Sequence, residues 1–263
     1  MIASIIIYEV LSGDIGRHVG LPAYCRTVEQ LSYIIRKGVK HMKDFTKYLE
    51  HELLRADATE ADAIRLFEEA KEYGMYSVCV DGCYVPLARK HLEGSGVVVG
   101  TVIGFPLGTV TVGTKAAELY EALEDGAQEV DTVLNIGALK DGKDDYVFSE
   151  ISVLAGTCHK EDVKFGIMIE AGLLTEEEIV KACTIAKNAG VTLISTSSGF
   201  SPGVATPEII KLIRKTVGEN VRVEASAGIE TLEQADALIE AGADKISTPN
   251  AAKIAKEYLE REK

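Results

Sequence analysis

The sequence predicts an α/β fold, a single (β/α)8 barrel of the TIM-barrel type with an N-terminal extension. The chain has 263 residues, and such a barrel typically needs about 250. From residue 42 onward, short apolar runs alternate with helical patterns eight times. Such units bury their strands only as a parallel sheet covered by helices. The count of eight favours a closed barrel over an open sheet.

The predicted strands are short runs rich in apolar and β-branched residues. They span residues 46–49, 76–80, 97–103, 129–134, 164–169, 192–195, 222–225 and 245–247. No G-x-G-x-x-G sequence follows the first of them, which argues against an open dinucleotide-binding sheet.

Start and stop residues bound several of the helices that separate these strands. Threonine often caps a helix N-terminus, and glycine often ends a helix because it adopts the left-handed conformation. The predicted starts are Thr59, Thr175, Thr206 and Thr231, and the predicted stops are Gly74, Gly190 and Gly242. Pro207 occupies a first helical position, where proline is favoured.

The first 41 residues are set apart from this pattern. Residues 28–37 predict an amphipathic helix after a stretch that contains Gly and Pro, and Met42 begins the segment that starts the barrel. We therefore divide the chain into an extension, residues 1–41, and a barrel domain, residues 42–263. The extension is either an appendage that packs or makes contacts, or the product of a start codon placed too early.

The net charge and the cysteine content limit which binding partners and which cellular compartment we expect for this protein. The chain has 41 acidic and 28 basic residues, a net charge of −13, which argues against binding nucleic acid or an anionic membrane. No apolar run approaches the roughly 18 residues of a membrane span, and the N-terminus lacks the basic region of a signal peptide. The five cysteines are scattered, as is typical of reduced thiols in the cytoplasm.

Active residues of (β/α)8 barrels lie at the C-terminal ends of the strands and in the loops that follow. We call this end of the barrel the mouth. The positions predicted there are Glu50, Asp81, the loop 104–108, Asp131, Asn135, Glu170, the run 195–200, Glu224, Ser226, Gly228 and Ser247. Five of them are acidic, so we expect an acidic mouth.

Several stretches resemble the class I deoxyribose-phosphate aldolase family. They are residues 47–54, 76–80, 101–108, 129–140, 196–200 and 225–229, within a resemblance that spans about residues 42–252. The resemblance implies a TIM-barrel lyase of deoxyribonucleotide catabolism that cleaves 2-deoxy-D-ribose 5-phosphate to acetaldehyde and glyceraldehyde 3-phosphate through a lysine Schiff base. It also implies a homodimer and no cofactor.

The lysines that the resemblance requires are replaced in this chain. Ser195 stands at the position of the Schiff-base lysine, and Glu224 at that of a second lysine that lowers the pKa of the first. Gly166 stands at a third lysine position, whereas Asp131 matches the acidic member of the catalytic set. Because an imine requires a primary amine that is partly neutral near pH 7, we predict an aldolase-like chain with weak or no activity, a pseudoenzyme by this criterion.

Other interpretations of the replaced lysines remain open. A relocated lysine could supply the amine, with Lys245 and Lys140 as candidates, although neither lies at a strand end by motif. The barrel could be non-catalytic and bind a ligand or another protein. It could also be a changed lyase, in which carboxylates bind Mg²⁺ or Mn²⁺ or Asp131 and Glu224 form an acid–base pair.

The resemblance also indicates the residues that bind substrate, with a small phosphorylated sugar or aldehyde as the expected partner. They are Cys79, Glu170, Thr196, Gly199, Ser226, Gly228 and Ser247, and no residue is assigned as a metal ligand. The phosphate loop is altered, because residues 247–250 read Ser-Thr-Pro-Asn where the family has Gly-x-Ser-Ser. Pro249 has no N–H to donate, and the side chain of Ser247 hinders close approach.

Overall fold

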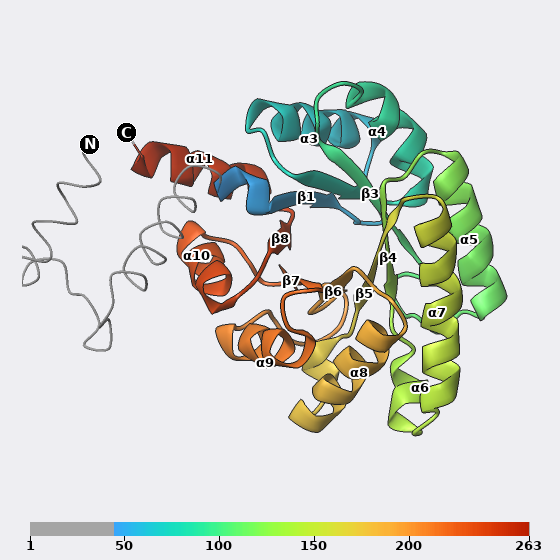
Figure 1. Cartoon of the computed structure of the whole chain (residues 1–263). Helices are drawn as coiled ribbons and strands as arrows, with labels where there is room; N and C mark the ends of the chain where they lie inside the picture. Colours follow the sequence, from blue (N-terminus) through green and yellow to red (C-terminus); the bar gives the residue numbers. More distant parts are fainter. Residues whose placement is uncertain (1–44, 263) are drawn as a thin grey trace, which may run out of the picture. The chain divides into compact units, whose positions relative to one another are not determined.

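The barrel closes in the order in which its strands follow one another along the chain. The structure is a computed structural model that describes residues 45–262. The predicted extension, its helix over residues 28–37 and the boundary at residue 42 lie outside the described residues. Within them, eight parallel strands pair in sequence, and β8 returns to pair with β1. The helices cover the outside of the strands (Figure 1).

The strand predictions are confirmed for seven of the eight strands. The strands are β1 Leu49–Leu53, β2 Ser77–Val80, β3 Val98–Ile103, β4 Glu129–Val133, β5 Lys164–Met168, β6 Leu193–Ser195, β7 Arg222–Ser226 and β8 Lys245–Thr248. From β2 onward each end agrees with the prediction to within one residue. The first prediction, residues 46–49, is wrong because Phe45–Tyr48 form a 3₁₀ turn, η1, and β1 begins at Leu49. Polar residues make up most of β1, so its sequence lacks an apolar run.

The helices follow the predicted starts and stops. They are α3 Glu60–Glu72, α4 Val85–His91, α5 Val112–Glu124, α6 Ile136–Lys140, α7 Asp144–Lys160, α8 Glu176–Asn188, α9 Pro207–Val217, α10 Leu232–Ala241 and α11 Ala251–Arg261, with 3₁₀ turns η2 Gly82–Tyr84 and η3 Ala171–Leu173. Thr59, Thr175 and Thr231 each form a capping box, and Thr206 caps α9. None of the described helices has the length and apolar character of a membrane span.

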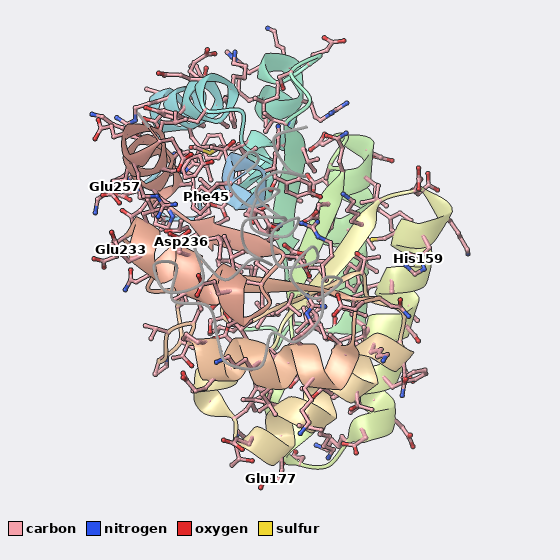
Figure 2. The ribbon with its side chains drawn as sticks, turned by 60° about the vertical axis from the view of Figure 1, so that its left-hand side comes forward. Phe45, His159, Glu177, Glu233, Asp236 and Glu257 are labelled. Atoms are coloured by element: carbon pink, nitrogen blue, oxygen red, sulfur yellow. The ribbon has the colours of Figure 1, made fainter. Side chains whose placement is uncertain are left out.

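Successive strand residues point to opposite faces of the barrel. The outward set packs beneath the helices and is apolar, with Val78, Val99, Val130, Ile167, Ile194, Val223 and Ile246 all at most 1% exposed. Burying each such side chain contributes roughly 1.5–3 kcal/mol. Acidic side chains such as Glu177 of α8 and Glu233 of α10 lie on the outer helices (Figure 2). The interior set is largely polar, and it contains the candidate site.

Candidate functional site

A buried ion cluster occupies the N-terminal half of the barrel interior. Lys245 Nζ, from the first residue of β8, lies 2.6 Å from Glu50 Oε2 and 2.9 Å from Glu224 Oε2. The same ammonium donates to Glu129 Oε1. All four side chains are buried. The arrangement joins β1, β4, β7 and β8 across the barrel.

Tyr76 links this cluster to the N-terminal end of the barrel. Its hydroxyl donates to Glu129 Oε2 over 3.2 Å and accepts hydrogen bonds from Arg222, at 2.9 Å, and from Lys164, at 2.5 Å. The Arg222 guanidinium lies 4.6 Å from the centre of the Tyr76 ring, a cation–π distance. These contacts add three residues, Tyr76, Lys164 and Arg222, to the network that begins at Glu129.

Lys245 remains protonated in this environment. Burial alone would lower the pKa of its ammonium, but surrounding carboxylates together raise that pKa well above its ordinary value. In decreasing order of effect they are Glu129, Glu224, Glu50 and Asp131. An ammonium has no lone pair to offer, so Lys245 is not a nucleophile at neutral pH.

Asp131 lies in the middle of β4. Its Oδ1 is buried and has no hydrogen-bond partner among residues 45–262. Burial is the main reason that the pKa of Asp131 is raised well above its ordinary value. Three carboxylate oxygens lie within 4.8 Å of one another, one each from Asp131, Glu50 and Glu224.

Glu52 is a site residue that the sequence analysis missed. Its side chain accepts a hydrogen bond of 2.9 Å from Ser247 Oγ. Burial raises the pKa of Glu52 to about 7, as it does for Glu50, so Glu52 can hold or release a proton near neutral pH. The sequence spacing could have identified Glu52, because it follows Glu50 by two residues and so faces the same side of β1.

The hydroxyl of Ser195 belongs to a buried network between β6 and β7. Ser195 is completely buried, and its Oγ lies 2.7 Å from Ser226 Oγ. Ser226 Oγ donates to the Ser197 carbonyl oxygen, and Thr196 Oγ1 donates to the Ser226 carbonyl oxygen over 2.9 Å. Every one of these hydroxyls has a protein partner, so the network stabilises the strand ends without requiring a ligand.

The loop after β6 packs over the mouth. Glu170 follows β5 in the left-handed conformation with φ 51°, and its Oε1 accepts a hydrogen bond of 2.6 Å from the Ser198 N–H. A Cβ atom on Gly228 would lie only 2.4 Å from Val204 Cγ1. Val204 therefore covers the backbone at Gly228, one of the residues predicted to bind substrate.

Cys79 faces the apolar half of the interior. It packs with Val102, Val133 and Met168. Burial raises the pKa of the Cys79 thiol well above its ordinary value, which disfavours the reactive thiolate.

An open cavity of about 520 Å³ lies at one side of the mouth. It lies between the end of β1, α3 and the loops after β6 and β8, and its lining includes Glu52, Gly199, Asn250 and Lys253. Asp131, Ser195 and Glu224 are at most 2% exposed and are not in this lining. The predicted catalytic residues are thus buried and do not line this cavity.

The expectation of an acidic mouth needs a correction. Glu50 is the second residue of β1, and Asp131 and Glu224 are the third residues of β4 and β7. These three carboxylates lie inside the strands, and only Asp81 and Glu170 follow strand ends. The motifs placed the residues on the correct strands, but they did not show how far each strand continues beyond its acidic residue.

Eight parallel strands closed around a largely polar interior define a (β/α)8 barrel. Residues 37–253 match the family model described as DeoC/LacD family aldolase. The chain belongs to the DeoC/LacD aldolase family, which confirms the resemblance that the motifs indicated.

Relatives and solved structures agree with this assignment. The deoxyribose-phosphate aldolase of Geobacillus sp. (strain WCH70) is 49% identical over 211 residues, which cover 80% of this chain and 94% of the relative. That of Thermococcus gammatolerans is 47% identical over 213 residues, covering 80% and 95%. The solved structure of the aldolase QR15 has a TM-score of 0.78 at 38% identity, covering 84% of this chain and 98% of that one. The tetrameric deoxyribose phosphate aldolase of Aeropyrum pernix has a TM-score of 0.79 at 26% identity, covering 86% and 97%.

Proposed function

We propose that this chain is a DeoC/LacD family barrel that does not form an imine, and that it binds a small phosphorylated sugar or aldehyde with weak or no lyase activity. One observation carries the proposal. Ser195, which stands at the position of the family's Schiff-base lysine, is completely buried and hydrogen-bonded to Ser226. A hydroxyl cannot form an imine, and this one is also shielded from the mouth cavity.

The two candidate lysines, Lys245 and Lys140, and the buried Lys115 are poor replacements for the missing amine. Of the lysines within residues 45–262, Lys115 and Lys245 are fully buried. Lys245 is held as an ammonium by its carboxylates. Lys115 lies outside the barrel interior, where it pairs with Glu150 of α7 and donates to the Val133 carbonyl oxygen. Lys140 pairs with Glu178 at the surface, 2.9 Å away. These contacts argue against a relocated Schiff base.

The mouth cavity supports binding of a small ligand. Its volume, about 520 Å³, lies within the roughly 300–1,000 Å³ of small-molecule sites. The names of the relatives suggest a deoxysugar phosphate. Val204 above Gly228 and Pro249 in the cavity lining argue for weaker phosphate binding than a free glycine-rich loop would give. The proposal also includes a cytoplasmic location. Free thiols at Cys79, Cys83, Cys158 and Cys183 favour this location. We further propose a homo-oligomer, as in the tetrameric relative.

Borohydride trapping tests the proposal directly. The full chain is incubated with acetaldehyde and sodium borohydride, and its intact mass is measured, with the Geobacillus relative treated in parallel as the positive control. We expect an ethyl adduct on the relative and none inside the barrel of this chain. An adduct that peptide mapping places on Lys245 or Lys115 would overturn the proposal.

Ligand binding is tested separately by thermal unfolding with 2-deoxyribose 5-phosphate. A ligand that binds only the folded state raises the midpoint as its concentration exceeds the dissociation constant. We expect a rise at millimolar ligand. A midpoint that stays constant up to solubility would refute binding and leave only a scaffold role.

A further inference from the structure

The barrel interior holds more acidic than basic side chains. Four carboxylates are buried there, on Glu50, Glu129, Glu224 and Asp131. Within residues 45–262, the cations at ion-pair distance from them are Lys245 and, 3.9 Å from Glu129, Arg222. If all four acids are ionised, the cluster keeps two uncompensated negative charges. Buried charges persist only when they are paired or bind a cation.

Asp131 is the carboxylate of this cluster whose negative charge has no neutralising partner among the described residues. Its side chain is 98% buried, since only 2% is exposed. No residue in the described part of the chain donates a hydrogen bond to its Oδ1. A buried acceptor without a partner is costly and requires an explanation such as an ion or a water molecule. Because Asp131 makes no ion pair with any residue from 45 to 262, Lys245 does not account for its position.

We propose that Glu50, Asp131 and Glu224 form a binding site for one divalent cation, Mg²⁺ or Mn²⁺, inside the barrel. Each residue offers one carboxylate oxygen, and the three oxygens lie within 4.8 Å of one another. Carboxylate oxygens are the ligands that these hard cations prefer. One divalent ion balances the two negative charges that remain when all four acids are ionised.

The chain gives the three ligands rigid support. They come from the middle parts of β1, β4 and β7, and Ser77 Oγ donates to Glu50 Oε2 over 2.6 Å. Lys245 contacts both Glu50 and Glu224. Its ammonium orients these two ligands, but it also repels a second cation. We therefore expect a site of moderate affinity, saturated at millimolar metal.

Direct metal titration tests this site. The full chain is stripped with EDTA, desalted and titrated with MnCl₂, while the electron paramagnetic resonance signal of free Mn²⁺ is measured. We expect one bound Mn²⁺ per chain, displaced by excess Mg²⁺. Failure to bind Mn²⁺ at millimolar concentration by a folded chain would overturn the proposal, and protons would then compensate the surplus charge.

Two variants locate the bound ion. Asp131→Asn keeps the size of the side chain and removes one ligand charge, so we expect it to weaken Mn²⁺ binding by about tenfold or more. Asp81→Asn is the matched control, because Asp81 follows β2 outside the cluster, and its affinity should match the wild type. Glu224→Gln serves as a second test if Asp131→Asn is unstable. Binding that survives both ligand variants unchanged would place the ion elsewhere and refute the assignment. No aldehyde is present in this titration, so its result is independent of the imine experiment.

Discussion

The carboxylate of Asp131 occupies the space in front of Gly166, because a Cβ atom on residue 166 would lie only 1.9 Å from Asp131 Oδ1. The two residues are paired in register on β4 and β5. Any side chain at position 166 would compete with the carboxylate for this space. Residue 166 stands at one of the family's lysine positions. The position of the Asp131 carboxylate therefore depends on the absence of a side chain at residue 166.

We predict that Gly166→Ala destabilises the protein. The added methyl group forces Asp131 to move within a closely packed interior, and overpacking of this kind costs roughly 1–3 kcal/mol. Urea unfolding measures the change. Adding Asp131→Ala to the same chain should recover part of the loss, because the contact is then absent.

Gly156→Ala is the control for the substitution itself. Gly156 lies within α7, and nothing lies within 4 Å of its added Cβ atom. Alanine is the better helix former by roughly 0.5–1 kcal/mol, so this variant should be slightly more stable than the wild type. Equal stabilities for the two alanine variants would contradict the contact between Asp131 and position 166.

We predict that Lys245→Met strongly destabilises the fold. Removing the ammonium leaves Glu50, Glu129 and Glu224 buried without their common partner, and breaking a buried ion pair on one side costs about 3–5 kcal/mol. The free energy of unfolding at neutral pH checks this. Lys140→Met is the matched control: its pair with Glu178 is partly exposed, and such surface pairs contribute roughly 0–1 kcal/mol. A similar loss in both variants would show that burial of the cluster does not matter.

We predict that Ser195→Lys introduces an amine that forms an imine only as the pH rises. Residue 195 pairs in register with Glu224, and a neighbouring carboxylate raises the pKa of a lysine and keeps it protonated. Borohydride trapping with acetaldehyde should therefore yield more adduct at pH 9 than at pH 7. Adding Glu224→Gln should shift the reaction to lower pH. An equal yield at both pH values would argue that Glu224 has no influence on position 195.

We predict unequal reactivity of the cysteines toward iodoacetamide. Burial raises the pKa of the thiols of Cys158 and Cys183 to about 12, so both stay protonated until the pH approaches that value, and the thiolate is the reactive form. At pH 8 the exposed Cys83 should be alkylated before Cys158 and Cys183, which should react only after denaturation. Peptide mass mapping distinguishes the sites. Rapid labelling of Cys158 in the folded chain would contradict its burial.

Local sequence signals predicted most of the fold. The apolar runs of β2 to β8 and the threonine caps of α3, α8, α9 and α10 depend on residues that are close together in the chain. β1 was misplaced because Glu50, His51 and Glu52 make it polar. Those residues are tolerated in a strand only because Lys245, Glu69 and Ser247 meet them from distant parts of the chain.

The candidate site was predictable only in part. The motifs identified Asp131, Ser195 and Glu224, and the structure brings all three into the barrel interior. They did not predict the ammonium of Lys245 among the glutamates, nor the unpartnered oxygen of Asp131. Both features depend on distances between different strands, and no motif within one strand records those distances.

The order of strands and helices, the family and the absence of an amine at residue 195 follow from the sequence alone, because each depends on residue identity or on short-range periodicity. The burial of Ser195, the charge state of Lys245 and the grouping of Glu50, Asp131 and Glu224 were decided by the closed barrel. Closure brings side chains far apart in sequence within a few ångströms of one another and removes water from between them. Proximity and desolvation together set pairing and pKa, and neither can be obtained from the order of residues.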